Sequence, residues 1–280
     1  TLEEVLDFYN NGGGKGRGIE VQNQTLPEDK LDLSEKEKQA YQTAYQQLRK
    51  AFPELNLILA TYFGALEDNL ELACDLPVNT LHVDLVRAPQ QLEELIHKLP
   101  QEKKLSLGLV DGRNIWKNDF ENSIAIINQA TAALGKERVW IATSCSLLHS
   151  PCDLDNEKNE AVLTAEIKQW MAFAKQKVAE LTILKQLTNN EEATLAKDKL
   201  AQNVKAQQSR KTSPLIHNEK VKNDVANITE SHDQRSNAFA KRRILQQEAL
   251  NLPSFATTTI GSFPQTTEVR SWRAKFKKSA

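Results

Sequence analysis

Short apolar runs alternate with amphipathic segments through the middle of the chain. Each run has the length and the Leu, Ile and Val content of a buried strand, and in each following segment apolar residues recur at helical spacing. The expected strands are 56–63, 80–86, 104–112 and 138–148. The expected helices are 33–52, ahead of the first strand, and then 65–76, 88–99, 119–135 and 160–187. Continuous apolar runs joined by helices predict parallel strands that are buried on both faces of a sheet.

Strict repetition of strand–helix units, without a hairpin, leaves a doubly wound sheet and a (β/α)8 barrel as the two candidate α/β folds. The four units correspond to half of a barrel. On its own, half of a barrel leaves two strand edges and one core face uncovered. We therefore expect the natural protein to contain further sequence upstream of Thr1.

Two segments outside this repeat are polar. Residues 1–32 are expected to be irregular, because "NNGGGKGRG" (10–18) is rich in Gly and lacks the Gly-Lys-Ser/Thr ending of a phosphate-binding loop. Residues 188–252 are crowded with Lys, Asn, Gln, Glu and Ala, and predict helices that break near Ser213-Pro214. We interpret them as a helical arm between domains. A coiled coil is the alternative, but its heptads are not sustained.

The last segment, 253–280, has the pattern of a new folding unit. "TTTIGSFP" (257–264) combines β-branched residues with a Gly and a Pro, as expected of a strand that leads into a loop. "TTEVRSWRAKFKK" (266–278) predicts a capped, basic, amphipathic helix.

Composition narrows the range of functions. The formal net charge of −1 gives no electrostatic reason to expect a nucleic acid or a membrane surface as a partner. No apolar run approaches the roughly 18–20 residues that span a bilayer. The three cysteines lack the spacing of a disulfide framework, and no signal peptide is recognisable. These features predict a reduced, cytoplasmic protein.

Polar residues gather where the expected strands end, which is where α/β barrels carry catalytic groups. They are Thr61, Tyr62, His82, Asp84, Asp111, Arg113, Asn114, Ser144, Cys145, His149 and Cys152. Within "DGRNIW" (111–116), the Asp and Asn side chains are expected to close a turn with Trp116 packed beneath it. Arg113 binding a carboxylate in bidentate fashion is the functional alternative.

The group formed by Cys145, His149 and Cys152 allows three interpretations. A zinc site would need four protein ligands, or three and a water, and the spacing is not a standard one. A Cys–His nucleophile pair would lack an obvious orienting acid. The third interpretation is a loop that closes the barrel mouth, with a buried Cys and a hydrogen-bonded His.

Several stretches together resemble one enzyme family. They are "LHVDLV" (81–86), "DGRNIWKNDF" (111–120), "SCSLLHSPCDL" (144–154), "SHDQRSN" (231–237) and "TTTIGSFPQTTEVR" (257–270). In order and spacing they resemble the cobalamin-independent methionine synthases, the 5-methyltetrahydropteroyltriglutamate–homocysteine S-methyltransferases. The resemblance runs from about residue 33 to residue 280.

The resemblance implies two (β/α)8 barrels joined by a helical connection, of which this chain would be an internal fragment. Residues 33–187 would form the C-terminal half of the N-terminal barrel, and 188–252 the interdomain connection. Residues 253–280 would be the first strand and helix of the C-terminal catalytic barrel. In place of an acidic strand end usual in the family, the chain has "GIEVQNQTLPEDKLDLS" (18–34).

The resemblance also implies the chemistry. A zinc ion, and no cobalamin, would bind the homocysteine thiolate, which takes the methyl group of 5-methyltetrahydropteroyltriglutamate. The zinc ligands would lie outside this chain, so the chain alone would be inactive. Ile260, Gly261 and Ser262 match the motif that contacts homocysteine, and the full-length protein would be a monomer. Cys145 sits where the catalytic copy has a zinc-binding Cys. A truncated remnant that acts as a binding or assembly module is the alternative.

Overall fold

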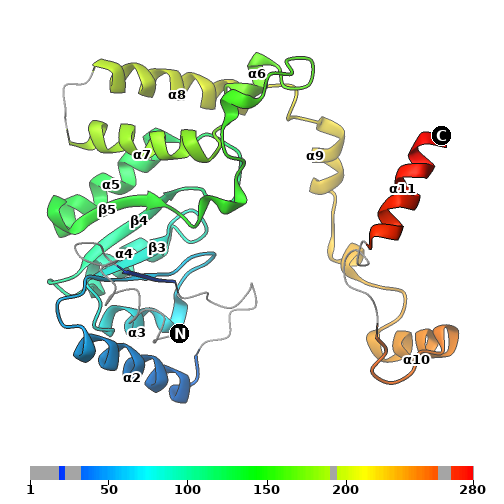
Figure 1. Ribbon diagram of the computed structural model, residues 1–280, viewed down its shortest axis with the longest axis horizontal. Helices are drawn as coiled ribbons and strands as arrows, with labels where there is room; N and C mark the ends of the chain where they lie inside the picture. The colour runs from blue at the N-terminus through cyan, green and yellow to red at the C-terminus, as the bar shows by residue number, and fades with distance from the viewer. Residues whose placement is uncertain (1–18, 23–32, 190–193, 258–265, 280) are drawn as a thin grey trace. The chain divides into compact units, whose positions relative to one another are not determined.

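The computed structural model describes residues 19–22, 33–189, 194–257 and 266–279 (Figure 1). The chain divides into two compact units, Thr1–Ile216 and His217–Ala280, and each is described here by itself. Among the described residues, no helix combines the length and the apolar character needed to cross a membrane.

A parallel sheet forms the centre of the first unit. In the described part of the chain it has five strands, in the order β1-β2-β3-β4-β5, so each strand lies beside its neighbour in the sequence. The strands are β1 (Ile19–Gln22), β2 (Leu57–Ala60), β3 (Thr80–Asp84), β4 (Lys104–Val110) and β5 (Val139–Thr143). The four predicted strands are confirmed, each somewhat shorter than its apolar run.

Strand β1 corrects the expectation that residues 1–32 are irregular. Its four residues pair in parallel with β2, Ile19 opposite Leu57 and Gln22 opposite Ala60. Backbone hydrogen bonds to a neighbouring strand can stabilise a segment this short, although its flanking sequence is rich in Gly and polar residues. The rest of 1–32 lies outside the described residues.

Helices connect the strands. They are α2 (Glu35–Ala51), α3 (Leu70–Asp75), α4 (Gln91–Lys98), α5 (Phe120–Leu134), α6 (Ala165–Lys168), α7 (Ala174–Thr188) and α8 (Thr194–Thr212). Helix α2 begins with a capping box, in which the Ser34 amide donates to Glu37 Oε2 at 2.8 Å. Short 3-10 turns occur at Glu67–Asn69, Lys136–Arg138, Leu147–His149 and Leu154–Asn156.

The two faces of the sheet differ in chemistry. On one face, leucines and valines such as Leu57, Leu81 and Leu107 are fully buried in a single core. That core also contains residues from α2, α3, α4, α5 and α7. On the other face, β3 presents His82 and β4 presents Ser106, which are paired across the two strands. Strands β2, β3 and β4 are largely buried, as expected, whereas β5 is only partly buried, and the second face mixes polar and apolar side chains.

The structure contradicts the prediction of one long helix over 160–187. The helical part is divided into α6 and α7 by a non-helical segment, Trp170 to Phe173, in which all four residues are buried. This segment pairs with the loop after β4, because the Lys117 amide donates to the Trp170 carbonyl and the Ala172 amide to the Ile115 carbonyl. The backbone bonds and the burial of large apolar side chains together outweigh helix continuation here.

Helix α8 lies alongside α7 and also contacts α5 (Figure 1). It ends at Thr212, and the predicted break near Ser213-Pro214 is confirmed. The second unit contains α9 (Glu219–Ala226), a 3-10 turn (Glu230–Asp233), α10 (Phe239–Leu250) and α11 (Thr267–Ser279). Helix α11 confirms the predicted helix, whereas most of the strand expected before it lies outside the described residues.

Candidate strand-end site

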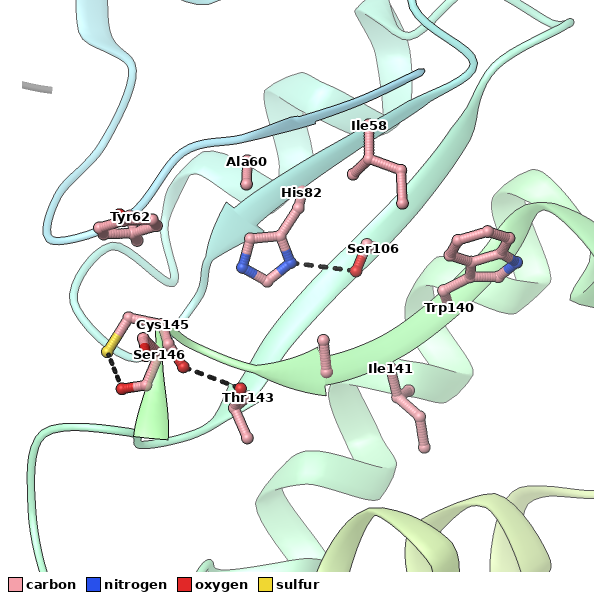
Figure 2. Close-up of a pocket in the computed structure, with 11 residues that line it drawn as sticks. Ile58, Ala60, Tyr62, His82, Ser106, Trp140, Ile141, Thr143, Cys145 and Ser146 are labelled. Atoms are coloured by element: carbon pink, nitrogen blue, oxygen red, sulfur yellow. Dashed lines mark hydrogen bonds between the residues drawn. The ribbon is translucent and has the colours of Figure 1, made fainter. Parts of the chain in front are cut away.

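A cavity of about 400 Å³ lies on the polar face of the sheet and reaches the carboxyl ends of the strands (Figure 2). Its volume is within the range of small-molecule sites. It is lined by Ile58, Ala60, Tyr62, His82, Ser106, Trp140, Ile141, Ala142, Thr143, Cys145 and Ser146. Apolar side chains therefore line the part near the strand starts, and polar groups line the part near the strand ends.

His82 is held by hydrogen bonds on both sides of its ring. Nδ1 lies 3.0 Å from Ser106 Oγ, and Nε2 lies 3.3 Å from the Ser144 carbonyl oxygen (Figure 2 shows the first contact). Because a carbonyl oxygen only accepts, Nε2 is the donor, and the Ser106 hydroxyl can donate to Nδ1 of a neutral ring. Both nitrogens of His82 thus have hydrogen-bond partners, and the ring also faces the cavity.

Asp84 organises the loops at the strand ends. Its buried carboxylate accepts the amide of Phe63 at 3.1 Å and the amides of Val86 and Arg87 at 2.9 Å each. Three backbone donors use most of the acceptor capacity of a carboxylate. Asp84 therefore fixes the loops after β2 and β3 and is not poised as a general base.

The segment after β4 forms the predicted turn. Asp111 Oδ1 accepts the Arg113 amide at 2.8 Å, and Asn114 Oδ1 accepts the Trp116 amide at 3.0 Å. The Asn114 side chain also donates to Asp111 Oδ2 at 2.8 Å. Trp116 packs against the small core beneath the turn. The structural interpretation of "DGRN" is thus confirmed.

Gly112 places this turn directly beside the loop after β5. A Cβ at this position would lie 2.8 Å from the Cys145 carbonyl oxygen and 2.9 Å from Cys145 Sγ, closer than real contacts allow. The Gly112 amide donates to Ser144 Oγ at 3.1 Å. Only Gly lets the two backbones approach this closely.

Cys145, His149 and Cys152 have different surroundings. Cys145 is buried, its Sγ lies 3.6 Å from the Ser146 carbonyl oxygen, and burial raises the pKa of its thiol. His149 is exposed, and its ring meets the Phe63 ring edge-to-face. Within the described part of the chain its ring forms no hydrogen bond, which corrects the expectation of a hydrogen-bonded histidine. Cys152 is exposed. In the described part of the chain, no three His, Cys, Asp or Glu side chains form a group that could hold a metal ion.

A buried charged group on α7 was not anticipated from the sequence. Lys177 donates to Asn114 Oδ1 at 3.1 Å and to the Trp116 carbonyl at 2.9 Å. Glu180 accepts the Asn118 amide at 3.0 Å, and burial raises the pKa of its carboxyl to about 7. The sequence gives little indication that these two residues are buried, since Lys and Glu three residues apart are typical of a solvent-exposed helix face. These groups anchor α7 to the loop after β4.

The predicted homocysteine-contacting residues, Ile260, Gly261 and Ser262, lie outside the described residues. Six of the predicted strand-end residues fall into two sets. Tyr62, His82 and Cys145 line the cavity, whereas Asp84, Asp111 and Asn114 hold the surrounding loops.

Comparisons with known proteins match two successive parts of the chain to the same enzyme. A family model described as the N-terminal domain of cobalamin-independent synthase matches residues 17–135, and one described as its catalytic domain matches residues 255–280. The first match includes residues 17–32, which lie ahead of the resemblance noted above.

Curated relatives agree with both matches. The chain is 54% identical over 250 residues to a protein of Flavobacterium johnsoniae named 5-methyltetrahydropteroyltriglutamate–homocysteine methyltransferase. It is 52% identical to the Cytophaga hutchinsonii protein of that name and 47% to the Xylella fastidiosa one. These alignments cover 88–89% of this chain and 32% of each relative, so the chain spans about a third of their length. The chain belongs to the cobalamin-independent methionine synthase family.

Proposed function

We propose that the chain is part of a zinc-dependent methyltransferase that moves the methyl group of 5-methyltetrahydropteroyltriglutamate to homocysteine, giving methionine. The observation that carries the proposal is the match to both synthase domains in one chain, together with 54% identity to a named methyltransferase. Homocysteine and the folate are the proposed partners, and the proposed location is the cytoplasm. We also propose that the full-length protein is a monomer.

A (β/α)8 barrel is the proposed architecture of the first unit. Its support is the sequential parallel strand order and the placement of helices against one face of the sheet. A doubly wound sheet instead carries helices on both faces and reverses its strand order. In a barrel, the polar face with His82 and Ser106 would be the lumen. We propose 33–187, together with strand β1, as part of this barrel, 188–252 as the interdomain connection and 253–280 as the start of the catalytic barrel.

The described side chains do not fit a zinc ion, because no suitable group of ligands occurs among them. We therefore derive no catalytic step through the metal from this structure. On the family resemblance, we propose that the ligands lie outside this chain and that the 280 residues alone do not turn over.

Growth of a methionine-requiring bacterial strain that lacks methionine synthase activity tests both proposals. The natural gene product is expected to restore growth on homocysteine, and the 280-residue chain is expected not to. Failure of the natural gene product would refute the proposed activity. Growth supported by the 280-residue chain would instead refute the placement of the zinc ligands outside it.

Homocysteine contact is proposed for Ile260, Gly261 and Ser262. Gly261 would permit close approach of the backbone, and the Ser262 hydroxyl could bond the carboxylate or the amine. In the natural gene product, Ser262→Ala should raise the KM for homocysteine roughly tenfold or more, as expected when a hydrogen bond to a charged group is lost. The KM for the folate should not change. Ser271→Ala, at an exposed position of α11, is the matched control, and an unchanged homocysteine KM in Ser262→Ala would contradict the assignment.

An assembly module is the second candidate, favoured by apolar side chains exposed on the second unit. Trp272 and Phe276 of α11 are 63% and 74% exposed, and Val221 and Val225 of α9 are also exposed. Exposed apolar groups at helical spacing are typical of surfaces that pack against another element. The growth experiment separates the candidates, because an assembly module would not support growth in either form.

A further inference from the structure

Asn118, in the loop after β4, joins four secondary-structure elements of the first unit. Its amide, side chain and carbonyl form hydrogen bonds of 2.8–3.1 Å with β4, α5, α7 and α8. The partners are Leu109, Ser123, Glu180, Asn203 and Gln207. We call Asn118 and these partners the Asn118 junction. Helix α8 is thereby held through the same residue whose amide binds Glu180.

The Asn118 junction is buried by the described part of the chain itself. The exposed fractions of Ser123, Glu180 and Asn203 are only 2%, 5% and 2%. The junction lies among α5, α7 and α8, which contact one another (Figure 1), and the described lining of the cavity includes none of its residues. Further strands or helices of the natural protein could therefore only add to this burial.

Glu180 is the ionisable residue of the junction, and its carboxyl group has an incomplete set of hydrogen bonds. Oε1 accepts the Asn118 amide at 3.0 Å, whereas Oε2 is buried without a hydrogen-bond partner among the described residues. Burying an ionised carboxylate costs much more than burying a neutral carboxyl, unless the oxygens of the carboxylate are bonded. The closed junction therefore suits the neutral form of Glu180, and the ionised form requires access of water.

Cations near Glu180 do not offset its burial. Burial raises the pKa of its carboxyl to about 7, although the Asn118 amide and then Lys177 and Lys117 favour the ionised form. The Lys177 ammonium is bonded elsewhere, to the turn after β4. The other charged or titratable side chains around these contacts are Asp111, Cys145, Lys199 and Arg210. The Glu180 carboxyl therefore changes its charge near neutral pH.

Helix α8 is the element of the junction that separates at least cost. It contributes Leu200 to the periphery of the large core, together with the small buried side chains of Ala196 and Ala206. Helix α7 instead places four apolar side chains in or against that core, namely Leu181, Ile183, Leu184 and Leu187. The amide side chains of α8 can exchange their hydrogen bonds for bonds to water. Separation of α8 thus admits water to Glu180 without opening the core.

We propose that the Asn118 junction makes the attachment of α8 to the first unit dependent on pH: α8 stays bound while Glu180 is neutral and separates more readily once Glu180 is ionised. Because the pKa of Glu180 is higher in the closed junction than in water, its stabilisation is fully present below about pH 4.5 and is lost as pH rises through about 7. Helix α8 lies in the segment proposed as the interdomain connection, so the junction sets how firmly that connection is held. The inference is independent of the proposed methyl transfer.

Hydrogen exchange of the backbone amides in the 280-residue chain at pH 5 and pH 8 tests the proposal, with protection factors that correct for the pH dependence of the chemical exchange step. The protection factor across 194–212 should fall roughly tenfold or more from pH 5 to pH 8, and should be below that of β3 at both. A factor that does not change with pH would overturn the proposal. Equal factors in α8 and β3 would also overturn it, because α8 would then separate only when the core unfolds.

A neutral variant identifies the controlling group. Glu180→Gln stays uncharged at both pH values and keeps an oxygen that can accept the Asn118 amide. Its α8 protection should change less than about threefold between pH 5 and pH 8, whereas Glu157→Gln, at an exposed position, should match the wild type. A fall in Glu180→Gln as large as that of the wild type would exclude Glu180.

An NMR titration of the wild-type chain tests the junction without any substitution. The carboxyl carbon signal of Glu180 and the side-chain amide signals of Asn203 should change together, with a common midpoint at about pH 7. The side-chain amide of Gln91, which donates to the Asp84 carbonyl on another part of the sheet, should not follow them. A Glu180 midpoint at the ordinary value of a carboxyl, or Asn203 signals that do not follow Glu180, would overturn the proposal.

Discussion

Glu180 is the residue whose environment departs furthest from that of a typical surface carboxylate. Its side chain is buried; one oxygen accepts the Asn118 amide, and the other has no partner among the described residues. Burial raises the pKa of the carboxyl to about 7, while the Asn118 amide and then Lys177 and Lys117 act in the opposite direction. The folded protein therefore holds a proton here that the unfolded chain releases near its ordinary pKa.

Replacement of Glu180 by Gln should change how stability depends on pH. Because the pKa of Glu180 is higher in the folded state, its contribution is fully present below about pH 4.5 and is lost as pH rises through about 7. Wild-type unfolding free energy should fall by on the order of 2–3 kcal/mol from this group between pH 5 and pH 8, and Glu180→Gln should lack that part of the decrease. Urea unfolding at the two pH values measures the difference.

Glu157→Gln is the matched control, since Glu157 is exposed and the substitution removes the same charge. It should reproduce the wild-type pH dependence. A Glu180→Gln variant whose stability changes with pH as steeply as that of the wild type would show that the carboxyl does not titrate in this range.

Among the strand-end residues, only contacts between neighbours in the sequence were predictable. Asp111 and Asn114 bond amides two residues onward, so their turn follows from residue type and spacing. Phe63 and Arg113 are 50 positions apart and meet because β2 and β4 end at the same edge of the sheet. The role of Glu180 depends on the packing of α7 against the loop after β4, which periodicity does not specify.

At the scale of elements, amide side chains hold α8 against the rest of the first unit. Asn203 Nδ2 donates to the Asn118 carbonyl at 2.8 Å, and Asn203 Oδ1 accepts the Phe120 amide at 3.2 Å. Gln207 donates to the carbonyls of Lys117 and Asn118, both at 3.1 Å. The polar composition of 188–252 concealed this packing, because the sequence contains few apolar residues that would indicate a buried face.

Asn203→Ala should loosen α8. The substitution leaves the Phe120 amide and the Asn118 carbonyl without their side-chain partner at a buried position, which should cost about 1–3 kcal/mol. Hydrogen exchange should quicken across 194–212, and urea unfolding should show the loss of stability. Gln202→Ala, at an exposed position of the same helix, should alter neither quantity. Normal protection of α8 in Asn203→Ala would mean that the helix does not depend on the Asn203 side chain.

The pattern of apolar residues predicts an element correctly where it is compatible with a strand or with a helix, but not with both. Strands β2 to β5 and helices α2 to α5 were predicted because apolar runs and helical spacing alternate clearly, whereas β1 was not. The interruption between α6 and α7 was missed because Trp170, Met171 and Phe173 fit an apolar helix face as well as a buried extended segment. In β3, His82 lies between Leu81 and Val83, so polar and apolar residues alternate in the sequence. The apolar neighbours nevertheless favoured the prediction of a strand that is apolar on both faces.

For the whole molecule, the sheet leaves two outer strands. In the described sheet, β1 and β5 each have a neighbour on one side only. Trp140 of β5 is 42% exposed and lines the cavity. Unpaired strand edges and exposed aromatic side chains favour association between chains.

The 280-residue chain should therefore associate in solution. Light scattering coupled to size-exclusion chromatography should give a mass above 31.5 kDa that increases with concentration. Trp140→Lys places a charge on the outer strand and should lower the mass. Trp272→Lys makes the same change on α11 and shows whether the second unit is responsible instead. A monomer that unfolds in one sharp transition would contradict the assignment of half of a barrel.

The difference between the two faces of the sheet also bears on how such a protein can change over time. In β3 and β4, Leu81, Val83, Leu105 and Leu107 belong to the leucine-rich core, whereas His82 and Ser106 between them line the cavity. Substitutions at core positions such as Leu81 or Leu107 would be removed by selection for stability, because a cavity in the core costs several kcal/mol. Selection on substitutions at His82 or Ser106 would depend mainly on what the cavity binds, because both residues line it. Tolerance to mutation should thus alternate every second residue, so that new ligand preferences can arise without loss of the fold.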